Sequence, residues 1–106
     1  MPKYLIRASY TSQGAKGVIA EGGSGRKEAI ANVAKQLNGE VECLYFAFGD
    51  DDVVVIFDFP DNVSAAAVSM TVGASGLVNA TTTVLLTPDE VDEASRKSVS
   101  YRGPGQ

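Results

Sequence analysis

The fold is decided by the stretch from Tyr45 to Asp61, which reads YFAFGDDDVVVIFDFPD. An aromatic and apolar run ends at Gly49, three aspartates follow, and a β-branched and aromatic run then extends from Val53 to Phe59. Two such runs separated by a short polar segment are typical of a β-hairpin. The stretch therefore predicts two antiparallel strands, over residues 40–48 and 53–59, joined by an acidic turn.

The segment before this hairpin predicts a strand and a helix. Residues 3–10 alternate imperfectly between apolar and polar side chains, as a half-buried strand does. After a weak helical turn capped by Thr11 or Ser12, residues 25–38 place apolar side chains at helical spacing. Ser24 is the expected N-cap of this helix, and Gly39 the left-handed residue that ends it.

The segment after the hairpin predicts a helix, a strand and a second helix. Asp61 or Asn62 caps a helix of small residues that ends near Gly73, and a threonine-rich strand covers residues 77–86. The sequence Thr87-Pro88-Asp89-Glu90 is a capping box with proline at the first helical position. A short helix should therefore run to Arg96 or Lys97, which places the domain at residues 1–97 and a polar tail at 98–106.

The order βαββαβ predicts an α+β, ferredoxin-like fold with a four-stranded antiparallel sheet. Both main helices cover one sheet face, and on the second strand Val41, Cys43, Tyr45 and Ala47 should share a face. Because the strands carry apolar residues on both faces, we expect the uncovered face to pack on a second copy, as in dimeric α+β barrels. Arg7 and Asp58 interrupt the two central strands, and we expect them to pair there.

Composition excludes several kinds of function. The net charge of −4 argues against nucleic acid as a partner, and no apolar run is long enough to span a membrane. The sequence has no histidine, which excludes Ser-His-Asp and Cys-His catalysis, and its only cysteine, Cys43, forms no intramolecular disulfide. We expect a cytoplasmic protein with no metal site and no cofactor.

Short motifs along the chain match a known family. They include Ala8-Ser9-Tyr10-Thr11, Gly14-Ala15-Lys16-Gly17, Tyr45-Phe46-Ala47-Phe48-Gly49, Asp52-Val53-Val54 and Pro60-Asp61. On these residues the chain resembles the GYD domain family of small bacterial and archaeal proteins, nearly to Val91. The resemblance implies the dimeric α+β barrel fold and no particular activity. The family's Gly-x-Tyr-Asp turn corresponds to Gly49, Asp50, Asp51 and Asp52, so aspartate replaces its tyrosine at position 51.

Three groups of residues are candidates for a site. Arg7, Tyr10, Tyr45 and Asp58 could line a ligand pocket, although a salt bridge and hydrophobic packing explain the same residues structurally. The turn residues Gly49, Asp51 and Asp52 favour a solvated hairpin turn, with Asp52 accepting backbone hydrogen bonds, over a cation site. Gly22 to Lys27 places two cations at a helix N-terminus, which suits an anion but lacks the P-loop spacing.

Two main functions are compatible with these residues, besides that of a purely structural or regulatory interaction protein. The first is a homo-oligomer that binds a small molecule or a partner without catalysis. The alternative is a cofactor-independent enzyme, of the monooxygenase or isomerase type, which acts on a small aromatic ligand. That enzyme would need an enclosed cavity lined by Tyr10 or Tyr45 together with Arg7 or Asp58.

Overall fold

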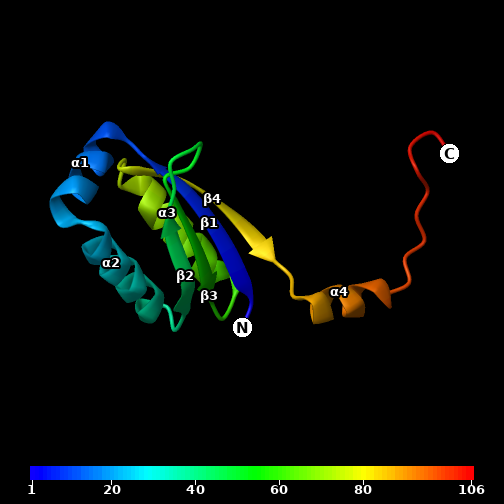
Figure 1. Cartoon of the computed structure of the whole chain (residues 1–106). Helices are drawn as coiled ribbons and strands as arrows, with labels where there is room; N and C mark the ends of the chain where they lie inside the picture. Colours follow the sequence, from blue (N-terminus) through cyan, green and yellow to red (C-terminus); the bar gives the residue numbers. More distant parts are fainter.

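Four strands form one antiparallel sheet in the computed structural model, which describes residues 1–106 (Figure 1). The strand order is β2-β3-β1-β4, so β1 and β3 are the central strands. This order confirms the predicted α+β, ferredoxin-like arrangement. The bounds are Lys3–Tyr10 for β1, Glu40–Phe46 for β2, Val53–Asp58 for β3 and Val78–Leu85 for β4.

Of the four helices, two lie against the sheet, one lies at its end, and the last stands clear of it (Figure 1). Helix α2 contacts β2, helix α3 contacts β4, and α1 lies at one end against α2 and β1. No helix is long and apolar enough to span a membrane. The helices are α1 at Ser12–Glu21, α2 at Gly23–Gln36, α3 at Asn62–Ala74 and α4 at Pro88–Ser95.

Side-chain caps begin three of these helices as the sequence predicts. Thr11 accepts a hydrogen bond from the Gly14 backbone N–H at 3.2 Å, and Asp61 accepts one from Ser64 at 2.8 Å. Hydrogen bonding from the Ser64 backbone N–H, and from its side chain, holds the pKa of Asp61 below its usual value. The capping box at Thr87 is complete, because Thr87 and Glu90 exchange side-chain hydrogen bonds with each other's backbone.

The ends of α2 differ from the prediction. The helix begins at Gly23, and its N-cap is Gly22 rather than Ser24. Gly22 has a φ of 84°, and this left-handed residue separates α2 from α1. At the other end Asn38 adopts the left-handed conformation, with φ of 58°, and Gly39 does not. Gly39 is required for another reason, since a Cβ there would collide with the Asp58 carbonyl oxygen and lie 2.6 Å from the Phe59 ring.

A β-bulge in β2 overturns one prediction about side-chain direction. Val41 lies opposite Phe57 but Cys43 lies opposite Ile56, so Glu42 is an extra residue in the strand. Because side chains alternate along a strand, one extra residue moves every following side chain to the opposite face of the sheet. Val41 and Leu44 consequently pack on the core, while Cys43 and Tyr45 lie on the other face. The prediction that Val41, Cys43 and Tyr45 share a face is wrong.

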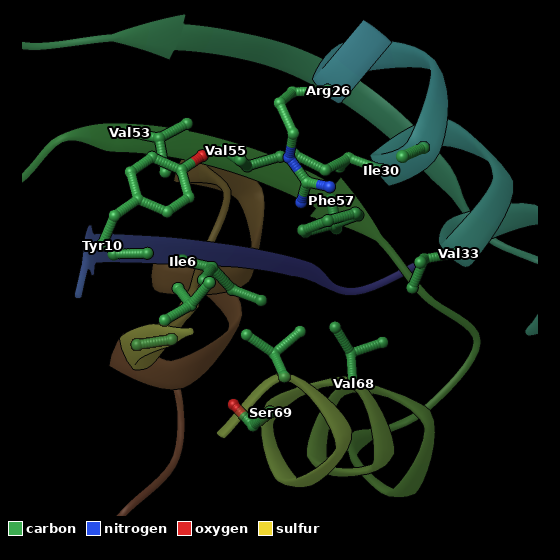
Figure 2. A pocket seen from close by; sticks show the side chains of 15 residues that line it. Ile6, Tyr10, Arg26, Ile30, Val33, Val53, Val55, Phe57, Val68 and Ser69 are labelled. Carbon is green, nitrogen blue, oxygen red and sulfur yellow. The ribbon is translucent and has the colours of Figure 1, made fainter. Parts of the chain in front are cut away.

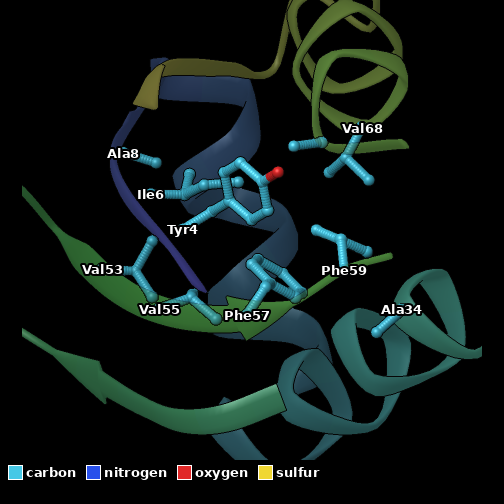
Figure 3. Close-up of a cluster of buried hydrophobic side chains, with 10 residues drawn as sticks. Tyr4, Ile6, Ala8, Ala34, Val53, Val55, Phe57, Phe59 and Val68 are labelled. Atoms are coloured by element: carbon cyan, nitrogen blue, oxygen red, sulfur yellow. The ribbon is translucent and has the colours of Figure 1, made fainter. Parts of the chain in front are cut away.

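The core lies between the central strands and the helices (Figure 3). Phe57 and Phe59 stack with ring centroids 5.0 Å apart, and Tyr4 lies 6.0 Å from Phe59. The Tyr4 hydroxyl donates to the Asn62 side chain at 2.6 Å, and burial raises the pKa of Tyr4. The buried residues are Tyr4, Ile6, Ala8, Ala34, Val53, Val55, Phe57, Phe59, Ala65 and Val68.

No helix covers the opposite face of the sheet, which we call the open face. It carries the alternate side chains of the central strands, among them Leu5, Arg7, Val54, Ile56 and Asp58. The chain leaves β4 as an arm, residues 86–106, that contains α4 and extends away from the sheet (Figure 1).

Replacing Gly39 with alanine should destabilise the domain, because the new Cβ meets backbone and a buried ring rather than a flexible side chain. We expect urea unfolding to show a loss of about 1–3 kcal/mol for Gly39→Ala. Gly49→Ala is the matched control, since a Cβ at Gly49 has open space and its φ is not left-handed. Equal losses for the two variants would contradict the steric explanation.

Candidate functional site

A cavity of about 140 Å³ lies over the central strands, between α2 and α3 (Figure 2). Thirteen of its fifteen lining residues are hydrophobic, and we call it the inner cavity. Strands β1 and β3 form its floor, and α2 and α3 form its walls. The lining residues are Ile6, Ala8, Tyr10, Arg26, Ala29, Ile30, Val33, Val53, Val55, Phe57, Val68, Ser69, Val72, Val78 and Ala80.

Arg26 is the charged residue in this lining. It belongs to the first turn of α2, and Figure 2 shows its side chain among the apolar residues of the cavity. Its Nη1 lies 3.6 Å from Glu21 Oε2, while its Nε is buried and has no hydrogen-bond partner. The Arg26 side chain is 29% exposed, so the guanidinium is partly withdrawn from water.

A second cavity, of about 340 Å³, adjoins the first and is lined by α1, the end of α3 and the start of β4. We call it the outer cavity. It shares four residues with the inner cavity, namely Tyr10, Arg26, Val72 and Val78. Its other walls are more polar and include Gln13, Glu21, Thr71 and Ser75. The two cavities therefore form one site that is apolar at the inner end and polar at the outer end.

The close approach of α1 to the start of β4 forms one wall of the outer cavity. The Thr11 N–H donates to the Leu77 carbonyl oxygen at 3.0 Å. Gly14 comes so close to the same carbonyl that any Cβ at position 14 would collide with it. Glycine at position 14 thus lets α1 lie against this end of the sheet, next to Tyr10.

The structure does not bring the four predicted pocket residues together. Tyr10 lines both cavities, whereas Arg7, Tyr45 and Asp58 lie on the open face. Tyr45 is 71% exposed there.

The expected pairing of Arg7 with Asp58 is wrong. The strand register places Lys3 opposite Asp58 and Arg7 opposite Val54. Lys3 Nζ donates to Asp58 Oδ1 at 2.8 Å, and this hydrogen bond raises the pKa of Lys3. Arg7 Nε lies 3.9 Å from Asp51 instead.

The acidic turn has the structural role that the sequence predicts, because Asp52 accepts a backbone hydrogen bond. Asp52 Oδ2 accepts a hydrogen bond from the Tyr10 N–H at 2.8 Å, and the Asp52 N–H donates to the Ala8 carbonyl oxygen at 2.8 Å. The Asp52 carbonyl oxygen accepts from Ala47. No group of three or more acidic or cysteine side chains is placed to hold a metal ion. The turn therefore ties the β2–β3 hairpin to the end of β1.

Comparison with known protein families supports the resemblance. The model of the GYD domain matches residues 4–95. The chain belongs to the GYD domain family. The matched region of this GYD domain includes both cavities and the acidic turn, and it ends with α4. No curated protein and no solved structure matches the chain.

Tyr10 was predicted as a pocket residue, whereas Arg26 was predicted only as one cation of a possible anion site at a helix N-terminus. Arg26 precedes Ala29, Ile30 and Val33 by three, four and seven residues, so helical spacing places it on the apolar stripe of α2. In this GYD domain Arg26 lines both cavities, so its side chain lies where they meet. The glycine-rich segment before Arg26 was the available signal for this position.

Replacing Asp52 with alanine should destabilise the fold, because the Tyr10 N–H would lose a charged acceptor. We expect a loss of about 1.5–3 kcal/mol in the free energy of unfolding. Asp50→Ala is the control, since Asp50 is exposed, and we expect its effect to stay within about 0.5 kcal/mol. If Asp50→Ala lowered the free energy of unfolding as much as Asp52→Ala, the turn would act through its overall charge and not through this hydrogen bond.

Proposed function

We propose that this protein is a homo-oligomer that binds a small molecule in the inner cavity without catalysis. The observation that carries the proposal is a partly open apolar cavity of about 140 Å³ between the sheet and helices α2 and α3. Its apolar walls contact water when no ligand is present, and an apolar ligand that covers them gains the hydrophobic free energy of that surface. An apolar cavity of about 150 Å³ is large enough to hold benzene. One aromatic ring or a short alkyl chain therefore suits the inner cavity.

The polar groups of the inner cavity favour binding over catalysis. Besides Tyr10 and Arg26 they include Ser69, whose hydroxyl is hydrogen-bonded to Thr82 at 2.5 Å. The enzyme alternative requires Arg7 or Asp58 beside the ligand, and both residues lie on the open face. The inner cavity is lined by no carboxylate or thiol, and the one carboxylate of the outer cavity, Glu21, lies 3.6 Å from Arg26 Nη1.

The open face supports a second copy of the chain as the partner. Apolar Leu5 and Ile56 lie opposite each other at its centre, beside the exposed ring of Tyr45. The face carries the cations Lys3 and Arg7 and also carboxylates, so two copies can approach without repulsion between charges of one sign.

The arm gives independent support for association. Val91, Val99 and Tyr101 are exposed along it. Helix α4 has only eight residues, and an isolated helix of that length is marginal in water even with a good cap. A neighbouring copy that packs on the arm would stabilise both the helix and these apolar side chains.

Light scattering at micromolar concentration should give at least twice the 11.1 kDa mass of one chain. Tyr45→Lys should shift the protein toward the monomer, because it places a charge on the open face. Val63→Lys on α3 is the matched control, since Val63 is 78% exposed on the helix side of the sheet. A monomeric wild type, or equal dissociation by both variants, would reject the open face as the interface.

Filling the inner cavity should abolish ligand binding. Ala29 of α2 lines the inner cavity, and Ala29→Leu adds a side chain that occupies it. We expect the wild type, but not Ala29→Leu, to bind the neutral probe phenylacetamide in ligand-observed NMR. Ala66→Leu, on the exposed side of α3, should bind like the wild type. Equal binding by Ala29→Leu and the wild type would place the ligand elsewhere.

A further inference from the structure

We infer that the ligand is an amphipathic organic carboxylate, whose apolar part enters the inner cavity and whose carboxylate pairs with Arg26. The inference rests on the proposed function and deepens it by naming the chemical class of the ligand. Two features of the site carry it, the unpartnered Nε of Arg26 and the junction of an apolar cavity with a polar one.

The first feature is the hydrogen-bonding state of Arg26. A guanidinium offers five N–H donors and no acceptor, and it matches a carboxylate with two parallel hydrogen bonds. In this structure the buried Nε has no acceptor, and the one nearby carboxylate, that of Glu21, lies 3.6 Å from Nη1. A buried charged donor without a partner is costly, so an anionic acceptor from a ligand would be strongly favoured.

The second feature is the position of Arg26 along the site. Arg26 and Tyr10 line both cavities, so they mark the junction between them. Figure 2 shows Tyr10 projecting from β1 into the same space as Arg26. A carboxylate at this junction would leave its apolar substituent among valines and Phe57. The other end of the ligand would face Gln13, Thr71 and Ser75 of the outer cavity.

These dimensions restrict the ligand. The inner cavity of about 140 Å³ suits one ring or a short alkyl chain next to the carboxylate. The outer cavity, at about 340 Å³, leaves room for polar groups beyond the carboxylate. Glu21 lines that outer cavity, and its charge disfavours a dianion such as a phosphate monoester over a monoanionic carboxylate.

Phenylacetate and its neutral analogue phenylacetamide test this inference by isothermal titration at low ionic strength. We expect the wild type to bind phenylacetate roughly tenfold or more tightly than phenylacetamide, as a charged hydrogen-bonded pair implies. Arg26→Gln should abolish this preference, because it weakens phenylacetate binding far more than phenylacetamide binding. Lys27→Gln is the matched control, because it removes the same charge from the exposed neighbouring position.

The removal of Glu21 provides a test that does not depend on the folding of an Arg26 variant. Glu21→Gln takes away the carboxylate that lies beside Arg26, so it should tighten phenylacetate binding several-fold and change phenylacetamide binding much less. A loss of phenylacetate affinity in Glu21→Gln would overturn the assignment of the carboxylate to Arg26.

The outcomes separate this inference from the proposed function. Equal affinity of the wild type for the acid and the amide would overturn the inference and leave the proposed function standing. Binding of neither probe would reject both. A loss in Lys27→Gln as large as that in Arg26→Gln would show general electrostatic attraction, and would also overturn the inference.

Discussion

The site depends on how far apart two helices lie on a four-stranded sheet. Helix α2 packs on β2 and α3 on β4, which are the two edge strands. Three strand spacings separate these edges by about 14 Å, whereas two packed helices lie about 8–10 Å apart. The two helices are therefore too far apart to pack directly on each other, and only side chains can fill the space between them above β1 and β3. The residues there include Ala8, Ala29 and Ala80, which are too small to close the gap, and the inner cavity is the result.

The acidic turn and the cavity are parts of one arrangement. The Asp52 carboxylate holds the backbone N–H of Tyr10, and Tyr10 lies where the inner and outer cavities meet. The acidic turn thus fixes the strand end that carries a cavity residue. Aspartate at position 51 does not disturb this joint, because its carboxylate lies on the open face near Arg7. The hydrogen bonds that tie the turn to β1 are made by Asp52.

Periodicity and capping residues were sufficient to predict the order of the elements. They could not reveal the bulge at Glu42, which depends on pairing with β3 and reverses the faces of Leu44 and Tyr45. Arg7 and Asp58 do share the open face, but the register places them four positions apart along the paired strands, a distance of about 13 Å. Arg26 was predicted only as part of an anion-binding helix start, because its place between the two cavities also depends on β1 and α3, which are distant in the sequence. Local patterns predict elements, whereas this site is set by contacts between them.

The position of a bound ligand tests this account most directly. We expect intermolecular nuclear Overhauser effects between the ring protons of phenylacetate and the methyl groups of Val33 and Val68, which line the inner cavity. Leu5 and Ile56 lie on the open face and should show none. Effects confined to Leu5 and Ile56, or none at saturating ligand, would contradict a binding site between the helices and the sheet.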